Sequence, residues 1–559
     1  GIHVDSPPVI PSLTTSYAHG TSSTTLLHTT IGESLLRTVE RCPDREALVF
    51  LEGGVRKTFA QFQQDVDQAA AGLLALGLKK GDRLGMWGPN TYEWVLFQFA
   101  TAKAGIILVS VNPAYQLQEV EFALQKVGCK VVVCPTQFKS QKYCDMLRRI
   151  CPEIESSSPS DIKSALPDLR SVIVLDSRQP GMLHLDDVMQ AGSSQYVQQL
   201  QDLQKKLSFD DPINIQFTSG TTGAPKGATL SHHNIVNDAY FVGRRVGYHW
   251  RICLPVPLYH CFGSVGGGMC MAVHGTSLIF PSAGYDGKAN IAALESERCT
   301  FIYGTPTMYV DMVNQPDLPK YDLSSVEAIM AGSPCPPELV KKVISVMGIK
   351  EITIGYGTTE NSPVTFCGAT TDNMERKSET VGFIIDHLEA KIVNPTTREV
   401  VPLGMLGEIM IRGFAVMLAY WGDKAKTEEC ITETGWYKTD IGSLDAYSYL
   451  RIEGRIKDMI IRGGENVYPA EIEQFLHTHP KVKEAQVVGI EDARMGEEIC
   501  ACIKLVDGQE CTAEEIKAFC KGQIAHFKIP RYVLFVSSYP LTITGKIQKN
   551  KLREESEKQ

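Results

Sequence analysis

The sequence predicts an α/β protein with a large N-terminal domain and a small C-terminal α+β domain. At 559 residues the chain is too long for one ordinary domain. Short apolar segments alternate with helical patterns, as in parallel strand–helix–strand units. A polar segment, residues 454–458, separates this region from a smaller one that also alternates strand and helix signals. We therefore expect a flexible extension at 1–31, a large domain at 32–456 and a small domain at 457–559.

The first elements of the large domain follow from periodicity. Residues 59–78 predict a helix and 83–88 a buried strand. Residues 91–105 predict a second helix, and 106–111 the next strand. This alternation favours parallel pairing of the two strands.

An uncharged segment follows in the middle of the chain. Residues 252–285 contain no Asp, Glu, Lys or Arg, but Pro255, Gly263 and Pro281 interrupt them. They contain no uninterrupted apolar run near the roughly 20 residues that a membrane-spanning helix needs. We expect a buried strand–helix–strand that lines an apolar cavity, and no transmembrane segment.

The small domain shows its own strand and helix signals. Pro469 suits the first turn of a helix, and Thr512 with Glu515 forms the pattern of a capping box. Apolar runs at 484–490, 499–506 and 531–538 predict strands.

Composition limits the function classes. A net charge of −9 argues against a broad contact with nucleic acid. The sixteen cysteines include no Cys-x-x-Cys pair, which favours reduced core residues over disulfides or a zinc site. Residues 1–31 are rich in Ser, Thr and His and contain one acidic residue, Asp5. This composition is typical of the segment that remains beside a cleaved transit peptide. The Arg-rich part of such a peptide is not visible, and the oligomeric state stays open.

The segment FTSGTTGAPKG, residues 217–227, has the composition of a phosphate-binding loop. An alternating apolar pattern before it predicts a strand, and its glycines permit close approach of the backbone to an anion. Lys226 adds a positive charge. No Ser or Thr follows this lysine, and the next helix is predicted only from Ser231, so the loop differs from that of nucleotide triphosphatases.

Five segments in a fixed order resemble the adenylate-forming superfamily of acyl-CoA synthetases, luciferases and peptide-synthetase adenylation domains. They are TSGTTGAPKG (218–227), YGTTENSPV (356–364), GWYKTDIG (435–442), GRIKDMIIRGGENVYPAEIE (454–473) and PLTITGKIQKNKL (540–552). The match covers nearly the whole chain and is closest to medium-chain fatty acid:CoA ligases. It implies a large adenylate-forming domain, with two α/β subdomains and a distorted β-barrel, and a mobile small domain.

The resemblance also implies catalytic roles. The fatty acid carboxylate would attack the α-phosphate of ATP, so positive charges and donors must lie where negative charge accumulates. Lys226 would stabilise the departing β- and γ-phosphates, and Lys546 would bridge the carboxylate and the α-phosphate. Thr359 would donate to the α-phosphate, and His260 would lie beside the carboxylate. Glu360 would bind the Mg²⁺ that accompanies ATP.

The rest of the nucleotide site is implied in the same way. Tyr356 would pack on adenine, Asp440 would accept from the ribose hydroxyls, and Arg455 would contact ribose and phosphate. The family usually has Thr-Gly-Asp at Thr439-Asp440, and the missing glycine could mis-aim Asp440. The remaining expected nucleotide-binding residues are Thr218, Ser219, Gly220, Thr221, Thr222, Gly223, Gly332, Ser333, Gly357 and Thr358.

For the second half-reaction, the resemblance implies that the small domain rotates about Lys457. Gly463, Gly464 and Glu465 would then face CoA, and the two glycines would allow close approach of its thiol arm. ATP, a fatty acid and CoA are the expected substrates, and the mitochondrial matrix is the location that the resemblance implies.

Two alternatives stay open at this point. A luciferase-type monooxygenase that oxidises an acyl-adenylate would carry the same motifs. A non-catalytic acyl- or nucleotide-binding protein is suggested by the altered turn at Thr439-Asp440.

Overall fold

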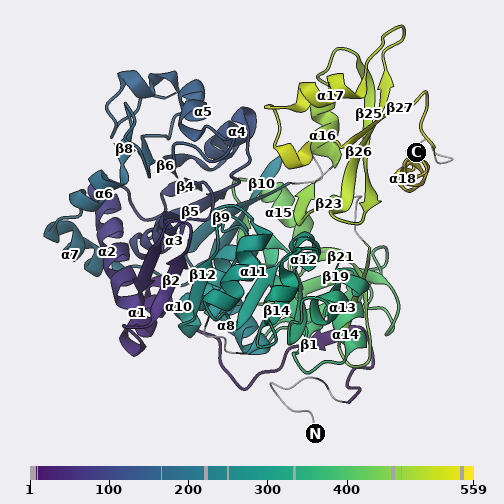
Figure 1. Ribbon diagram of the computed structural model, residues 1–559, viewed down its shortest axis with the longest axis horizontal. Coiled ribbons are helices and arrows are strands. Elements are labelled where there is room, and N and C mark those ends of the chain that lie inside the picture. Colours follow the sequence, from purple (N-terminus) through teal and green to yellow (C-terminus); the bar gives the residue numbers. More distant parts are fainter. Residues whose placement is uncertain are drawn as a thin grey trace.

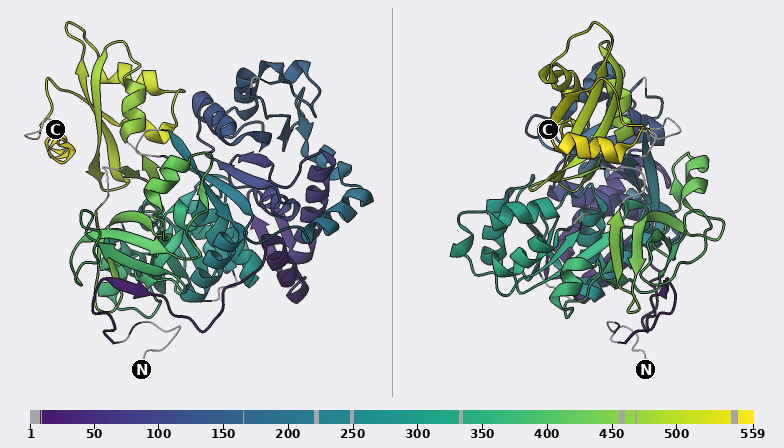
Figure 2. Two further views of the ribbon diagram at one scale, coloured as in Figure 1. Left: turned by 180° about the vertical axis from the view of Figure 1, so that it is seen from behind. Right: turned by 90° about the vertical axis from the view of Figure 1, so that its right-hand side faces the viewer.

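Four β-sheets organise the chain in this computed structural model, which describes residues 8, 10–164, 166–219, 224–247, 251–331, 335–454, 460–467, 469–541 and 547–559. Three of the sheets lie in the large N-terminal part (Figure 1), and the fourth lies in the smaller C-terminal part, drawn in yellow-green and yellow. The views from behind and from the side (Figure 2) show the same division. Both views agree with the predicted large and small domains, whose boundaries stay predictions.

The first sheet contains the predicted N-terminal strands. Its order is β20-β10-β9-β5-β4-β6-β7-β8, with parallel pairing from β9 through β8 and antiparallel pairing at β10 and β20. The strands are β4 (Arg83–Trp87), β5 (Ile107–Val111), β6 (Cys129–Cys134), β7 (Ser171–Val174), β8 (Leu183–His184), β9 (Pro212–Ser219), β10 (Pro225–Ser231) and β20 (Ala419–Tyr420). The helices between and beside them are α2 (Phe59–Ala75), α3 (Tyr92–Ala104), α4 (Leu117–Val127), α5 (Tyr143–Ile150), α6 (Leu185–Ala191) and α7 (Ser194–Gln204).

These bounds confirm the predicted helices and strands of this region. The predicted helix at 59–78 is α2, which ends three residues earlier than the pattern suggested. Helix α3 is buried along nearly its whole length, because α2, α7, β4 and β5 pack against it.

The second sheet has the order β17-β16-β15-β14-β13-β11-β12-β2-β3. Its strands are β2 (Glu46–Phe50), β3 (Val55–Thr58), β11 (Arg251–Cys253), β12 (Ser277–Phe280), β13 (Phe301–Gly304), β14 (Glu327–Ala331), β15 (Glu351–Gly357), β16 (Val364–Cys367) and β17 (Phe383–Ile384). The associated helices are α1 (Ile31–Arg41), α8 (His232–Val246), α11 (Gly287–Ser296), α12 (Pro306–Val313), α13 (Pro337–Ser345) and α14 (Met374–Glu379).

The uncharged segment forms part of this sheet. Strand β11 is followed by α9 (Cys261–Gly263), the π-helical turn η2 (Ser264–Met269) and α10 (Cys270–His274), and then by β12. This confirms the predicted buried strand–helix–strand. Among the helices described, none is long and apolar enough to cross a membrane.

The third sheet corrects part of the prediction for the N-terminus. Its order is β1-β18-β19-β21-β22, with antiparallel pairing throughout, and its strands are β1 (Tyr17–His19), β18 (Glu389–Val393), β19 (Gly407–Arg412), β21 (Tyr437–Leu444) and β22 (Leu450–Gly454). Residues 17–19 were expected within a flexible extension, but they are ordered because β18 offers them a strand edge. The Tyr17 hydroxyl donates to Glu389 at 2.5 Å, which fixes the strand further.

The fourth sheet builds the small domain. Its strands are β23 (Ile460–Arg462), β24 (Glu465–Val467), β25 (Val482–Asp492), β26 (Gly496–Leu505) and β27 (Tyr532–Phe535), packed with α16 (Pro469–Leu476), α17 (Ala513–Cys520) and α18 (Lys549–Glu557). The Thr512 hydroxyl accepts from the Glu515 amide at 3.2 Å, which is the N-cap half of the predicted capping box. The helix start at Pro469 is as predicted.

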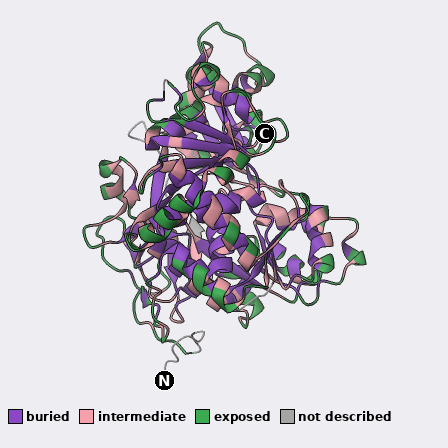
Figure 3. Ribbon diagram, turned by 90° about the vertical axis from the view of Figure 1, so that its left-hand side faces the viewer, coloured by how far each residue is buried: buried purple, intermediate pink, exposed green. Residues whose placement is uncertain are grey.

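The core lies in the sheets and the helices that pack on them, as the buried residues in Figure 3 show. All sixteen cysteines are free, and twelve of them are buried, so most lie in the core as expected. Burial of these apolar side chains contributes to the stability of the fold.

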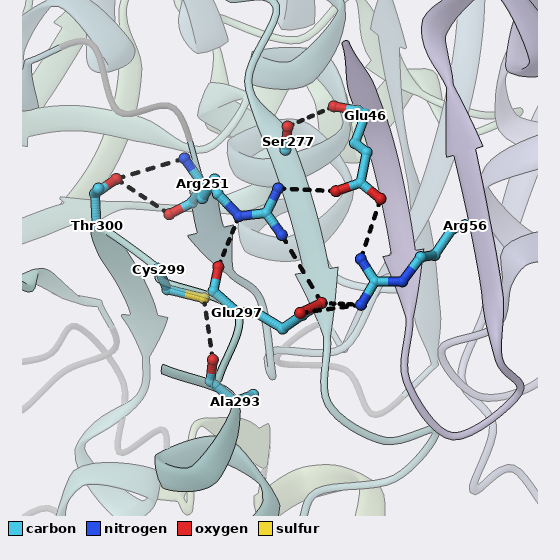
Figure 4. A network of polar contacts seen from close by, with 8 residues as sticks. All are labelled: Glu46, Arg56, Arg251, Ser277, Ala293, Glu297, Cys299 and Thr300. Atoms are coloured by element: carbon cyan, nitrogen blue, oxygen red, sulfur yellow. Dashed lines mark hydrogen bonds and ion pairs between the residues drawn. The ribbon is translucent and has the colours of Figure 1, made fainter. Parts of the chain in front are cut away.

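A charged network ties one end of the second sheet together (Figure 4). The Arg251 guanidinium donates to Glu46 at 3.0 Å and to the carbonyl of Glu297 at 2.7 Å. Arg56 bridges the same two acidic residues from the neighbouring strand. The network joins β3, β2 and β11 with the loop that precedes β13.

Arg251→Met is expected to lower the free energy of unfolding by about 1–3 kcal/mol, because half-buried carboxylate and carbonyl partners lose their donor. The Arg56 side chain is 49% exposed, so Arg56→Met is expected to lower the free energy of unfolding by less than about 1 kcal/mol. Denaturant unfolding of both variants measures the difference. An equal cost for the two would contradict this account of the network.

A buried carboxyl on α8 makes stability depend on pH. Asp238 is 1% exposed, and one of its oxygens accepts from the Val364 amide at 3.2 Å. Its other oxygen has no hydrogen-bond partner among the described residues. Burial raises the pKa of Asp238 well above its usual value.

A raised folded-state pKa means that the native chain holds a proton that the unfolded chain loses, so stability falls as pH rises above the unfolded value. Asp238→Asn removes this pH-dependent contribution to stability and keeps an oxygen that accepts from the Val364 amide. Its melting temperature relative to the parent is therefore expected to increase between pH 5 and pH 8. Thermal scans in matched buffers test this, and a difference that does not change with pH would refute it.

Candidate active site

One cavity of about 1130 Å³ gathers the predicted site residues whose side chains or glycine backbones the structure describes. Its lining comes from the three sheets of the large domain and from the small domain. The predicted residues that line it are Thr218, Lys226, His260, Tyr356, Gly357, Thr358, Thr359, Glu360, Asp440, Gly463, Gly464 and Glu465. Ser219 is the last residue of β9, beside Thr218. Gly220, Thr221, Thr222, Gly223, Gly332, Ser333, Arg455, Lys457 and Lys546 lie outside the described residues.

Lys226 reaches the cavity from the start of β10. It pairs across the hairpin with Thr218 of β9, so the predicted phosphate loop connects two antiparallel strands. Helix α8 begins at His232 with Ser231 as its N-cap, as predicted, so the loop does not open a helix. Lys226 is 9% exposed, and burial lowers its pKa, as does the nearby charge of Lys426. An anion bound beside Lys226 would stabilise its charged form and raise its pKa again.

Glu360 lies on the same side of the cavity. It belongs to the short 3₁₀ turn η4 (Thr359–Asn361) after β15, and its carboxylate accepts from the Tyr420 hydroxyl at 2.7 Å. The Lys226 Nζ lies 5.7 Å from the centre of the Tyr420 ring. A single carboxylate suits Mg²⁺ that is also bound by substrate phosphates, so the chemistry of Glu360 fits the predicted ion.

The turn before Glu360 is built for a ligand. A Cβ on Gly357 would lie 1.6 Å from the carbonyl oxygen of Pro363, so only glycine fits there. The Thr358 hydroxyl is buried without a hydrogen-bond partner among the described residues. A phosphate or ribose oxygen in the cavity would satisfy such a donor.

Asp440 faces the cavity through an irregularity in β21. Glu408 pairs with Ile441 and Met410 with Lys438, so Thr439 and Asp440 together lie opposite one residue of β19. This is a β-bulge, which redirects side chains. The Tyr356 hydroxyl donates to Asp440 at 2.5 Å. Although this turn lacks the glycine that is usual in the family, Asp440 still lines the cavity.

Asp440→Ala is expected to raise the KM for ATP about 10- to 100-fold with a smaller change in kcat, because hydrogen bonds to a charged group contribute ~1.5–3 kcal/mol. Steady-state kinetics with ATP varied measure this. Tyr356→Phe removes the same contact to Asp440 but keeps the carboxylate, and it serves as the control. An unchanged KM in the alanine variant would show that Asp440 does not hold the nucleotide.

His260 lies at the apolar end of the cavity. It is the N-cap of α9, where its Nδ1 accepts from the Phe262 amide at 3.3 Å. Burial lowers the pKa of His260 to about 4, so the imidazole is neutral near pH 7. Val256, Pro257 and Phe262 continue this wall of the cavity and offer apolar surface to an acyl chain.

A glycine turn of the small domain lines the same cavity as His260. Gly463 and Gly464 connect β23 to β24 with φ of +55° and +84°, which side chains rarely adopt. A Cβ on Gly464 would lie 3.1 Å from Thr305 of the large domain. The Tyr259 hydroxyl donates to the carboxylate of Glu465, which completes a contact between the two domains. Burial raises the pKa of Glu465.

Sequence reasoning missed three members of the site. Tyr420 holds Glu360, Tyr259 holds Glu465, and Thr305 lies against the glycine turn. Tyr259 falls within the uncharged segment that was predicted to line an apolar cavity. Nothing in the spacing of Tyr259 or Thr305 indicates a contact with the small domain. Tyr420 carries no motif signal.

Comparison with known proteins identifies the family. Models of the AMP-binding enzyme and of the AMP-binding enzyme C-terminal domain match residues 35–421 and 471–546. The chain belongs to the AMP-binding enzyme family. This confirms the predicted superfamily and its adenylate-forming fold.

Curated relatives within this family are similar over the whole chain. "Medium-chain acyl-CoA ligase ACSF2, mitochondrial" from Danio rerio is 72% identical over 565 residues, which cover 100% of this chain and 93% of that protein. The protein of the same name from Homo sapiens is 56% identical over 97% of this chain and 90% of its own. The solved structure "Mycobacterium tuberculosis fatty acyl CoA synthetase" has a TM-score of 0.65 and 26% identity, and it covers 95% of this chain and 98% of its own.

Proposed function

We propose that the protein is an ATP-dependent acyl-CoA synthetase that activates medium-chain fatty acids through an acyl-adenylate. It transfers the acyl group to CoA and releases AMP and pyrophosphate. The full-length identity of 72% to a medium-chain acyl-CoA ligase carries this proposal. The predicted residues that line one cavity support it.

In the first half-reaction, a carboxylate oxygen forms a bond to the α-phosphorus of ATP as the bond to the β-phosphate oxygen breaks. Lys226 stabilises the pyrophosphate that leaves, and Thr359 donates to the α-phosphate. Lys546 holds the carboxylate and the α-phosphate together. Glu360 would hold the Mg²⁺ that accompanies ATP, and the bound ion would neutralise part of the phosphate charge.

His260 contributes without a charge. Because its imidazole is neutral near pH 7, it can orient the fatty acid carboxylate by a hydrogen bond without neutralising the nucleophile. The apolar wall beside it excludes water from the acyl chain.

In the second half-reaction, the thiol sulfur of CoA attacks the acyl carbonyl carbon. A carbon–sulfur bond forms, the bond to the AMP oxygen breaks, and the thiol gives up its proton. Gly463 and Gly464 let the narrow thiol arm pass close to the backbone, with Glu465 beside it. Lys457 is the proposed pivot that exchanges this orientation with the one that brings Lys546 to the cavity.

We place the reaction in the mitochondrial matrix, which the word "mitochondrial" in the relatives' names supports at the level of the organelle. ATP, a medium-chain fatty acid and CoA are the substrates.

Incubation of the purified chain with C4 to C20 fatty acids, ATP, Mg²⁺ and CoA tests the proposal. Fatty acid-dependent ATP–pyrophosphate exchange and acyl-CoA formation that peak at C6 to C12 are the expected results. Binding without exchange would indicate a non-catalytic protein. Oxygen consumption or light from an adenylated luciferin, without acyl-CoA formation, would indicate a luciferase-type monooxygenase.

A further inference from the structure

A buried lysine joins the two domains at a second contact, in addition to that of the glycine turn. Lys528 lies in the short turn η5 (His526–Lys528) of the small domain. Its Nζ donates to Glu119 at 2.6 Å and to Glu471 at 2.6 Å. Glu471 belongs to α16 of the small domain, but Glu119 belongs to α4 of the large domain, which faces the small domain in Figure 1. The lysine therefore connects the domains through one of its two carboxylate partners.

The surroundings of this contact are closed to solvent. The side chains of Lys528 and Glu119 are 3% and 9% exposed. Although burial by itself lowers the pKa of Lys528, the charges of Glu471 and Glu119 raise it above its usual value. The Nζ also lies 5.3 Å from the centre of the Tyr115 ring. A buried ion pair is weak evidence for stability, but removing one partner from it is costly. The Lys528–Glu119 pair therefore favours the docked orientation of the small domain strongly over orientations in which the pair is broken.

The contact and the glycine turn belong to one interdomain surface. Lys528 and Tyr115 line a small cavity of about 60 Å³ together with Glu465, Tyr259 and His260. Ala114, directly before Tyr115, packs against the core of the small domain. Any rotation that withdraws the glycine turn from the cavity must therefore also carry Lys528 away from Glu119.

We propose that Lys528 is a positioning residue for thioester formation. Its bond to Glu119 latches the small domain in the orientation in which the glycine turn lines the active-site cavity. This inference rests on the proposed function, in which adenylation uses a different orientation of the small domain. Glu471 keeps the lysine in place on the small domain, and Glu119 is the part of the latch that is left behind when the domain rotates.

Two half-reactions measured on the same full-length preparations test the latch in Lys528→Met and in Glu119→Gln. Thioester formation from supplied acyl-adenylate and CoA is expected to fall about 5- to 150-fold, the usual range of coupling between two states. ATP–pyrophosphate exchange is expected to stay unchanged or to rise, because adenylation requires the latch to be open. The double variant is expected to lose little more than either single variant, since both remove one contact.

Lys103→Met is the matched control. Lys103 of α3 is 9% exposed and pairs with Asp67 of α2, so it is a buried lysine with an ion pair inside the large domain. Its replacement removes the same charge and no interdomain contact. The ratio of the two half-reactions is expected to stay at the wild-type value, even if stability falls.

An equal loss in both half-reactions of Lys528→Met, or an unchanged rate of thioester formation, would overturn the latch while leaving the proposed function standing. A wild-type chain that forms neither acyl-adenylate nor acyl-CoA would refute the proposed function, and the role of Lys528 with it.

Discussion

Lys546→Ala is expected to reduce adenylation strongly and to leave thioester formation from supplied acyl-adenylate largely intact. The first half-reaction brings together two anions, the carboxylate and the α-phosphate, and a lysine between them is the group that lowers this barrier. Loss of one such preorganised charge contact costs about 100- to 1,000-fold in rate. The second half-reaction begins from an uncharged acyl carbonyl, so it does not need this ammonium.

The measurement separates the two steps in one preparation. ATP–pyrophosphate exchange reports adenylation, and acyl-CoA formation from synthetic acyl-adenylate reports transfer. Lys549→Ala, three residues along the chain, is the control, because Lys549 pairs with Glu473 at 2.9 Å inside the small domain. An equal loss of both activities in Lys546→Ala would mean that this lysine supports the small domain and not the first step.

Glu360→Ala is expected to lower kcat/KM for ATP about 100- to 1,000-fold, because the variant loses the carboxylate proposed to hold Mg²⁺ against the phosphates. Raised Mg²⁺ concentration is expected to restore part of the activity, which a purely structural role would not explain. Steady-state kinetics at several Mg²⁺ concentrations measure both effects.

Tyr420→Phe is the control for Glu360. It removes the hydroxyl that donates to this carboxylate at 2.7 Å but leaves the charge in place. One neutral donor contributes about 1 kcal/mol, so a loss near tenfold or less is expected. Equal losses in the two variants, with no response to Mg²⁺, would show that the carboxylate acts only through Tyr420.

The local elements of the fold were predictable because their signals are local. Helices α2 and α3 follow from apolar periodicity, and β4 and β5 from the short apolar runs that follow these helices. The N-cap at Ser231 and the helix start at Pro469 follow from the chemistry of those residues alone. The strand at residues 17–19 was missed because a Ser- and Thr-rich segment gives no strand signal until β18 provides an edge for pairing.

The candidate site, like the fold, was predictable only in part. The family resemblance predicted Lys226, His260, Tyr356, Glu360 and Asp440 as parts of one site, and the structure places them around one cavity. The bulge at Thr439 and Asp440 was not predictable, since it depends on the register between β19 and β21. The sequence indicated an altered turn there, but not the direction of the Asp440 side chain.

By itself, the sequence determined the family, several of the strands and helices, and the residue types that can bind ATP, because these depend on local pattern and motif. Only the tertiary structure decided which partners support them. Tyr259 meets Glu465 across 206 positions of the chain, and Lys528 meets Glu119 across 409. Such contacts depend on how two separately folded domains dock, and no local propensity encodes that arrangement.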